Sequence, residues 1–391
     1  MTSHGQRPTL RQHEPRSDSF SHDTRRCRHP AYPNQGGVLS MHLGIKALQQ
    51  FLAAQPAQAP LVLATVIATD GSTYRKPGAM MLIGADERYA GMISGGCLEG
   101  DLVAQARAVF ADGQSRQVSY DLQNDEDLVW GLGLGCGGAV HLLLQRLDAE
   151  NDYAPLGPLF RALDAGHTAT LALLIEGQLP AGSWALETDD GHRQGEPELA
   201  AALVAHSSDR ETPRARRVTL RLGASSAEAV LMRVTPTPRI LVCGGGPDAV
   251  PLVAQIVALG WDCTVVDHRP AFAQPERFPA EARVQCLRPG KLTEGITLKT
   301  LSGAIVMSHH LEHDATYLRQ LAQTPPPYLA LLGPRARRDQ LLATIDAPDL
   351  KLHGPAGLDL GAELPEAIAL AIAAQLHAQL NGREGGPLSR G

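Results

Sequence analysis

The stretch Ile240-Leu241-Val242-Cys243-Gly244-Gly245-Gly246-Pro247-Asp248-Ala249 decides the fold of the C-terminal part of this chain. An apolar run typical of a buried strand ends in three glycines, and Ala249–Leu259 then has the apolar pattern of a helix. A second apolar run, Thr264–Val266, ends at Asp267, 23 residues after Gly244. Strand, glycine turn, helix and acidic residue in this order predict a Rossmann-type unit, with Gly244, Gly246 and Ala249 at its three small positions.

Further strands and helices alternate along the rest of the C-terminal part. Ala304–Met307 and Tyr328–Leu332 are short apolar strands that precede helical patterns, and Pro365–Leu380 is a long terminal helix. Such alternation predicts a parallel, doubly wound sheet. The proline-rich segment 235–238 reads as a linker. We therefore expect an α/β protein with a Rossmann-like domain at 237–382 and a flexible C-terminus at 383–391.

The preceding residues, 41–236, are expected to form an α+β domain. The charge-rich stretch 187–217 reads as loop or weakly ordered chain, and no internal repeat is visible. Thr69-Asp70-Gly71 reads as a turn. The expected helices begin at Met41 and cover Leu98–Phe110, and the expected strands are Leu61–Ile67, Ala79–Ile83, Tyr89–Ile93, Ala139–Leu144, Thr168–Ile175, Val218–Leu222 and Ala229–Val234.

Composition excludes several classes of protein. The chain has 391 residues, 43% of them hydrophobic, which suits two or three globular domains. A net charge of -6 argues against a general nucleic-acid binder. No apolar run reaches the roughly 18 residues of a membrane helix, and no secretory signal is present, so we expect a cytoplasmic protein. Residues 1–40 lack apolar periodicity and predict a disordered tail, with Met41 as an alternative start.

Two of the six cysteines stand in glycine-rich loops. Cys97 follows Gly95 and Gly96 and opens a helix, so we expect its thiol to have a lowered pKa and to serve as metal ligand, sulfur carrier or nucleophile. Cys136 lies within the loop 131–138. The alternative for Cys97 is a small buried residue that closes a turn. No partner lies at metal-ligand spacing, and the cysteines expected to pack as small core residues are Cys243, Cys263 and Cys286.

Charged groups mark four further loops, three of which also have a plain structural interpretation. Arg75 and Lys76 suit an anion or a solvated turn. Asp267 suits a ribose hydroxyl, and Arg269 a phosphate. The histidines His309 and His313 suit metal binding or proton transfer, or a polar turn in which Asp314 caps the next helix. The last cluster contains Arg335 and Arg338 and follows the strand at 328–332. It suits phosphate binding, or it lies on an exposed helix face.

Taken together, these motifs resemble the XdhC/CoxI family, accessory proteins for maturation of xanthine dehydrogenase and related molybdenum hydroxylases. The resemblance spans 41–382, whereas the tail 1–40 lies outside it and 187–217 match poorly. The matching stretches are Gly71–Met81, Ser94–Leu102, Gly135–Gly138, Arg239–Pro270, His309–Leu318, Leu331–Leu342 and His353–Ala362.

The resemblance implies a cofactor-insertion chaperone more than an enzyme, with no catalytic residue. Such a protein binds the molybdenum cofactor (molybdopterin), protects it during sulfuration and delivers it to apo xanthine dehydrogenase or a related hydroxylase. A cysteine desulfurase is the other implied partner, and a homodimer the implied assembly, with neither nucleic acid nor membrane as partner. The candidate molybdenum contacts are Cys97 and Cys136, and the other candidate cofactor contacts are Gly95, Gly96, Arg75, Lys76, Gly244, Gly246, Asp267, Arg269, His309, His313, Arg335 and Arg338.

Two other functions fit parts of the sequence. The glycine turn and Asp267 would suit an NAD(P)-dependent oxidoreductase, which lacks a convincing proton donor unless His309 or His313 serves. An interaction module that recruits a desulfurase without holding cofactor would not need the glycine–cysteine loops.

Overall fold

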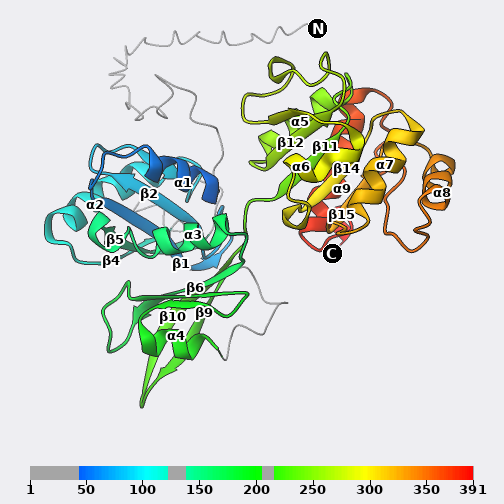
Figure 1. Ribbon diagram of the computed structural model, residues 1–391. Helices are drawn as coiled ribbons and strands as arrows, with labels where there is room; N and C mark the ends of the chain where they lie inside the picture. The colour runs from blue at the N-terminus through cyan, green and yellow to red at the C-terminus, as the bar shows by residue number, and fades with distance from the viewer. Residues whose placement is uncertain (1–43, 122–137, 205–214, 391) are drawn as a thin grey trace, which may run out of the picture. The chain divides into compact units, whose positions relative to one another are not determined.

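The computed structural model describes residues 44–121, 138–204 and 215–390 (Figure 1). Within these ranges the chain forms three five-stranded sheets, called here A, B and C in chain order. The expected tail 1–40, Met41 and Cys136 lie outside the described residues.

Sheet A is antiparallel throughout, in the order β3-β2-β1-β5-β4. Its strands are rich in Val, Leu, Ile and Met, which suit a pleated surface with packed neighbours. The strands are β1 (Leu61–Gly71), β2 (Met80–Gly84), β3 (Tyr89–Gly91), β4 (Arg116–Asp121) and β5 (Gly138–Leu147), with helix α1 (Ile45–Ala53) before β1 and α2 (Glu99–Asp112) between β3 and β4.

Sheet B repeats sheet A element by element. A helix, three strands, a second helix and two strands follow one another in both, and the strand order β8-β7-β6-β10-β9 matches that of sheet A. The expectation of no internal repeat is therefore wrong at the level of structure. The elements are α3 (Leu156–Asp164), β6 (Ala169–Glu176), β7 (Trp184–Thr188), β8 (Arg193–Gly195), α4 (Pro197–Leu203), β9 (Ala215–Leu222) and β10 (Ser225–Val234).

The two repeats share one core. Leu63 and Leu82 of sheet A belong to the same buried cluster as Leu171 and Val230 of sheet B, together with residues of α1 and α3. Helix α2 covers the other face of sheet A, and α4 the other face of sheet B. Since each fully buried aliphatic side chain contributes about 1.5–3 kcal/mol, these clusters hold both repeats together.

Residues 187–217 depart from the expected loop. Within them lie the end of β7, then β8, α4 and the start of β9; only 205–214 are not described. Pro197 is in the first turn of α4, where its missing N–H costs nothing, and Leu199 and Leu203 are fully buried. Most of the described charged residues that suggested a loop lie at exposed positions between these few buried residues. The expected turn at 69–71 is likewise part of β1, which pairs with β5 up to Gly71 and Gly138.

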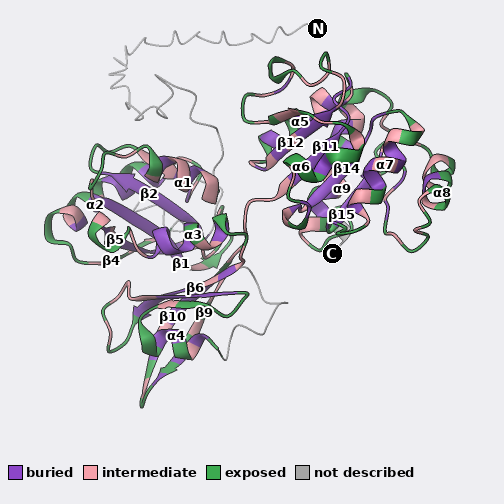
Figure 2. Cartoon of the chain, viewed as in Figure 1, coloured by how far each residue is buried: buried purple, intermediate pink, exposed green. Residues whose placement is uncertain are grey.

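Sheet C confirms the predicted Rossmann-type fold. It is parallel, in the order β13-β12-β11-β14-β15. Figure 2 shows β11, β12, β14 and β15 as mostly buried. The strands are β11 (Arg239–Cys243), β12 (Asp262–Asp267), β13 (Arg283–Cys286), β14 (Gly303–Val306) and β15 (Tyr328–Leu331), and the helices are α5 (Ala249–Ala258), α6 (Leu292–Gly295), α7 (Leu311–Leu321), α8 (Arg335–Thr344) and α9 (Pro365–Leu380).

Helices cover both faces of sheet C. Alternate residues of its strands point to α5 and α9 on one face and to α6, α7 and α8 on the other. The loops after the carboxyl ends of these parallel strands therefore gather at one edge, where doubly wound folds place their ligands. We call it the carboxyl edge of sheet C.

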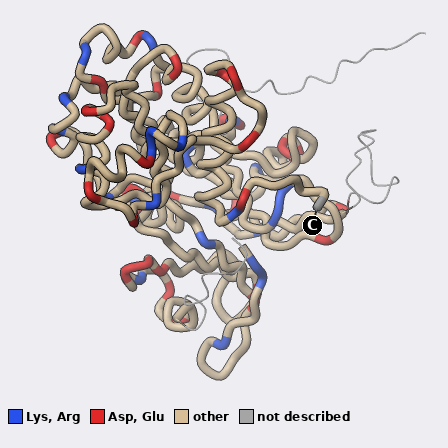
Figure 3. Tube along the Cα trace, turned by 90° about the vertical axis from the view of Figure 1, so that its right-hand side faces the viewer, with Lys and Arg blue, Asp and Glu red and all other residues tan. Residues whose placement is uncertain are grey.

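Positive and negative charges are mixed along the described part of the chain: Figure 3 shows Lys and Arg interspersed with Asp and Glu. No helix in the described ranges is long and apolar enough to cross a bilayer.

Candidate functional site

The topology of sheet A brings three loops to one end. Strands β1, β3 and β4 run toward this end, and β2 and β5 start from it. The loop with Arg75 and Lys76, the loop with Cys97 and the two anchors of segment 122–137 therefore lie at the same end, which we call the loop end of sheet A. Cys136 belongs to that segment, outside the described residues.

The loop end is what distinguishes the first repeat from the second. Seven residues, 92–98, join β3 to α2, whereas Glu196 alone joins β8 to α4. Sixteen residues, 122–137, join β4 to β5, whereas only Gly223 and Ala224 join β9 to β10. Because the shared fold does not need the longer connections, the two cysteine-bearing loops are additions to it, as expected of functional loops.

A carboxylate of the protein fills the glycine loop before α2. Glu99 is 3% exposed, and its oxygens accept the N–H groups of Ile93 (2.9 Å), Ser94 (2.8 Å) and Gly96 (2.9 Å). The Ser94 hydroxyl donates to Glu99 at 2.6 Å and accepts the N–H of Cys97 at 3.0 Å. The amides of this loop, which could otherwise hold a bound anion, thus surround an anion already in the chain.

These hydrogen bonds fix both the charge of Glu99 and the position of Cys97. Burial alone would raise the pKa of Glu99, but the hydrogen bonds from Ser94 and Ile93 outweigh it and hold that pKa below its usual value. Cys97, half-buried, is attached to this rigid loop directly before the first turn of α2. The loop therefore presents one soft sulfur ligand in a defined place.

An aromatic ring lies beside the Cys97 loop. Tyr74 is 61% exposed, and its ring atoms lie 3.7–3.8 Å from where a Cβ on Gly95 would be. At Gly138 a Cβ would lie 2.3 Å from the carbonyl oxygen of Asp70, so only glycine allows β5 to start this close to the first loop. Glycines thus allow the Cys97 loop to approach Tyr74 and β5 to start close to the end of β1.

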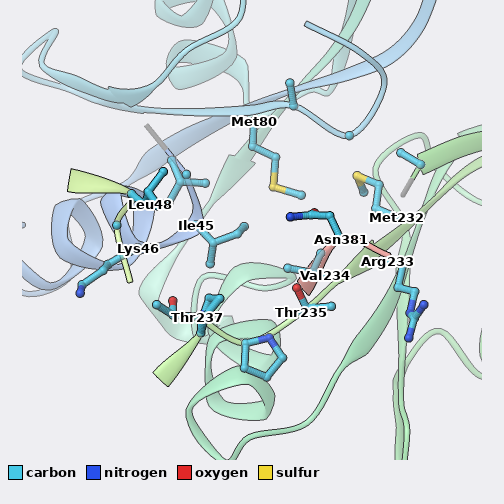
Figure 4. Close-up of a pocket in the computed structure, with 18 of the residues that line it drawn as sticks. Ile45, Lys46, Leu48, Met80, Met232, Arg233, Val234, Thr235, Thr237 and Asn381 are labelled. Atoms are coloured by element: carbon cyan, nitrogen blue, oxygen red, sulfur yellow. The ribbon is translucent and has the colours of Figure 1, made fainter. Parts of the chain in front are cut away.

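Arg75 and Lys76 are placed differently from Tyr74. They line a pocket together with Ile45, Met80 and Met232, and Cys97 is not among its lining residues. Figure 4 shows Ile45, Met80 and Met232 around this pocket. The structure therefore brings Tyr74, Gly95 and Cys97 together, and it places the two cations on a pocket that Cys97 does not line.

At the carboxyl edge of sheet C the glycine turn is tight. Gly244 has a φ of 119°, and a Cβ there would lie 2.5 Å from the carbonyl oxygen of Met307. At Gly245 a Cβ would lie 2.5 Å from the carbonyl oxygen of Phe272. These glycines serve close packing of the backbone.

Two carboxylates occupy the positions that a dinucleotide would need. Asp267 is 1% exposed and accepts the N–H of Gly245 at 2.8 Å and the guanidinium of Arg269 at 2.7 Å. Burial would raise its pKa, but these bonds prevail and bring the pKa to about 2. Asp248 Oδ1 would lie 2.7 Å from a Cβ on Gly246, and Pro247 has no N–H to donate. A pyrophosphate on this turn would meet a carboxylate, so the residues do not fit NAD(P).

A third internal anion lies in the first turn of α7. Asp314 is fully buried, accepts the N–H and hydroxyl of Ser308 at 3.2 and 2.5 Å, and pairs with Arg337 at 2.7 Å. Asp314 therefore fixes the turn before α7, but the capping role considered for it is wrong: the N-cap is His310, which has no side-chain cap hydrogen bond. His309, with a φ of 59°, lies 2.7 Å from Asp248 through Nε2.

The two predicted arginines have different surroundings. Arg338 donates to the carbonyl oxygen of Gly354 and to Asp339. Arg335 is exposed at the first position of α8, and no partner for it is found within the described ranges. Of the two, Arg335 has its charge available to a ligand.

The remaining cysteines divide into two classes. Cys243 and Cys263 are core residues as predicted; burial, with Asp314 nearby, raises the pKa of Cys243, and burial, with Asp262 nearby, raises that of Cys263 to about 12. Cys286 was expected in the core but is exposed, since β13 is a short, polar edge strand with no fully buried residue.

Sequence reasoning missed Glu99, Tyr74 and Arg337 as determinants of these sites. For Glu99 a signal existed, because the spacing Gly96-x-x-Glu99 equals that of a capping box, in which the glutamate reaches back to the first N–H. No local signal pairs Arg337 with Asp314, which belongs to another helix.

The chain matches two models of one family. The model described as the XdhC Rossmann domain matches residues 240–376, and that described as the XdhC and CoxI family matches residues 54–121. The chain is 30% identical over 322 residues to a Bacillus subtilis (strain 168) protein that is named as a probable subunit of xanthine dehydrogenase; the match covers 82% of this chain and 93% of that protein.

Two more distant similarities agree with this match. Identity is 24% over 273 residues to the Escherichia coli (strain K12) protein named molybdenum cofactor insertion chaperone PaoD, covering 70% of this chain and 66% of that protein. A crystal structure named a xanthine dehydrogenase from Bacillus halodurans superposes with a TM-score of 0.72 at 29% identity, covering 89% of this chain and 99% of the other.

Proposed function

Because this chain belongs to the XdhC and CoxI family, we propose that it is a maturation factor that holds the molybdenum cofactor as cargo, protects it during sulfuration and delivers it to a xanthine dehydrogenase-type hydroxylase. The name of the Escherichia coli relative supports the cargo, and that of the Bacillus subtilis relative supports the client.

The observation that carries this proposal is Cys97 on the loop held by Glu99. A thiolate is a soft ligand, which suits a metal in a sulfur-rich coordination sphere. The loop's amides are already used by Glu99 and Ser94, so the loop stays preformed whether or not cargo is bound. In this proposal Cys97 contacts the metal end of the cargo, and Cys136, on the neighbouring connection, is the second candidate.

Tyr74 supports a place for the pterin. A flat heteroaromatic ring gains about 0.5–1.5 kcal/mol beyond its buried area when it stacks on an aromatic side chain. Tyr74 is exposed and lies against Gly95, two residues before Cys97. A pterin on Tyr74 would therefore bring its dithiolene end toward Cys97.

The proposed role also implies two protein partners. Sulfuration needs a sulfur donor, for which a cysteine desulfurase is the proposed partner, and delivery needs an apo-hydroxylase. The homodimer implied by the family stays a prediction. No residue is proposed as catalytic, since insertion requires binding and release of the cargo rather than a chemical step on it.

The test is co-purification followed by transfer. The full chain is produced in a bacterium that makes the cofactor, and molybdenum and pterin are measured by mass spectrometry and by fluorescence after oxidation. The loaded protein is then mixed with cofactor-free xanthine dehydrogenase. We expect both components on the purified chain and recovery of dehydrogenase activity. Purified chain that carries neither component and activates nothing would refute the proposal.

A further inference from the structure

Three imidazole rings lie together at the carboxyl edge of sheet C. His268 follows β12, while His310 and His313 belong to the start of α7, after β14. The ring of His313 is central: its centroid lies 4.4 Å from that of His268 and 4.2 Å from that of His310. Because β11 lies between β12 and β14, the three rings come together from both sides of the strand that ends in the glycine turn.

The carboxylates around these rings have cationic or imidazole partners of their own. Asp267 pairs with Arg269 and Asp314 with Arg337, both at 2.7 Å. Asp248 pairs with His309 at 2.7 Å. Two acidic contacts remain: Asp267 Oδ1 lies 3.5 Å from His268 Nδ1, and the exposed Glu312 lies next to His313 in the chain. Protonated rings here would therefore carry positive charge that the pairs do not neutralise.

The surroundings favour a neutral His313 in the absence of ligand. Its Nδ1 is buried and has no hydrogen-bond partner within the described ranges. Burial lowers the pKa of His313, and His268 and His310 lower it further, while Asp314 and Glu312 act in the opposite direction. An added negative charge would therefore favour protonation of this ring.

The cluster does not have the geometry of a metal site. Within the described ranges, the group of three His, Cys, Asp or Glu residues whose donor atoms all lie within 4.8 Å of one another is His167, Asp189 and Asp190. The nitrogens of the three clustered rings do not converge in this way. A phosphate group is larger than a metal ion and accepts hydrogen bonds on separate oxygens, so its donors can lie farther apart.

We propose that His268, His310 and His313 form a binding site for a phosphate group, which binds together with protons taken up by the imidazoles. His310 is exposed and His268 is 29% exposed in its side chain, so the rings are accessible. The exposed Arg335 follows β15, the strand next to β14, and adds a cation to the same edge. The glycine turn, closed to phosphate by Asp248, does not compete for the ligand.

The phosphate can come from a pterin phosphate or from a nucleotide, and calorimetry distinguishes the two. The full chain is titrated at pH 6.5 with inorganic phosphate, pyrophosphate, AMP and a pterin monophosphate, each in MES and in Bis-Tris, whose ionisation enthalpies differ. We expect net proton uptake on binding. Affinity should fall by up to about tenfold per pH unit for each linked proton as the pH rises above 7. Preference for AMP or for the pterin identifies the source.

Matched variants locate the site. His313→Gln and the exposed His310→Gln should weaken phosphate binding at least tenfold and abolish its pH dependence. His167→Gln, the same change at a histidine in another part of the chain, should leave both unchanged. Circular dichroism of each variant checks the fold.

Four results would overturn the proposal. The first is that phosphate does not bind at millimolar concentration, and the second is that it binds without proton uptake. The third is that His310→Gln and wild type bind phosphate equally. The fourth is that the chain binds Zn²⁺ but no phosphate, and that His310→Gln loses the Zn²⁺ site. The outcome does not depend on Cys97, so it is separable from the proposed cargo function.

Discussion

The carboxylate of Glu99 lies inside the loop that Ser94 begins: one oxygen accepts the Ser94 N–H at 2.8 Å and the other accepts the Ser94 hydroxyl at 2.6 Å. The relationship recurs at Ser308 and Asp314, where a serine N–H and hydroxyl again donate to a buried carboxylate of the following helix. In both loops an internal anion fixes the backbone around a neighbouring Cys or His.

Replacing Glu99 tests how much this anion stabilises the loop. Glu99→Gln places an amide NH₂, itself a donor, among N–H and O–H donors. Because hydrogen bonds to buried charged groups contribute about 1.5–3 kcal/mol, we expect the free energy of unfolding to fall by about that amount. Urea unfolding measures it. The control Glu87→Gln removes an exposed ion pair with Arg107 and should cost under about 1 kcal/mol. Equal stability of both variants would contradict the role given to Glu99.

The lowered pKa of Asp267 predicts how the stability of the chain depends on pH. Its pKa is about 2 in the folded chain, below the 3.8 of a free aspartate, so its stabilising effect is complete above about pH 4 and is lost as the pH falls toward 2. Asp267→Asn should therefore be less stable than wild type at pH 6, and the gap should narrow at pH 3. Unfolding followed by Trp261 fluorescence, next to β12, gives the comparison. A gap that widens on acidification would contradict the assignment.

The filled glycine turn predicts no dinucleotide binding. Titration with NAD⁺ and NADP⁺ at up to millimolar concentration, followed by calorimetry, should give no saturable heat, because Asp248 lies against the turn that would hold the pyrophosphate and Gly245 and Arg269 already use both oxygens of Asp267. Gly246→Val should leave this result unchanged. Micromolar affinity in wild type that the valine removes would restore the oxidoreductase alternative.

Thiol labelling tests the division of the cysteines. At pH 7.5 a maleimide should label Cys97 and Cys286 in the native chain and spare Cys243 and Cys263, which are buried and whose pKa values are raised. Peptide mass spectrometry assigns each site. Bound cofactor should protect Cys97 but not Cys286. Labelling of Cys263 before unfolding would show that the core is more open than the structure indicates.

Sequence reasoning worked where apolar runs meet glycine. The strand before Gly244 and the helix after Gly246 followed from periodicity, because burial on both faces of a parallel sheet leaves continuous apolar runs. It failed at β13, which has no buried residue, and at α4, which buries three residues among charged ones. It missed the repeat because the copies share topology and not motifs.

The candidate site was predictable in its location and not in its contacts. Gly95, Gly96 and Cys97 predicted a functional loop from the sequence. That Glu99 fills this loop is known only from the structure, in which its carboxylate accepts the N–H groups of Ile93 and Ser94. Likewise Asp267 was found by its spacing, and only the structure shows that Arg269 and Gly245 use both of its oxygens.

Molybdenum content relative to pterin in Cys97→Ala, measured on protein purified from a cofactor-producing host, tests the central claim most directly. Cys286→Ala, an exposed cysteine at the edge of sheet C, is the control. If Cys97 contacts the metal end of the cargo, its variant should lose molybdenum while it retains most of the pterin, and it should fail to activate cofactor-free dehydrogenase. A Cys97→Ala protein with the molybdenum-to-pterin ratio and activation of the control would contradict the account.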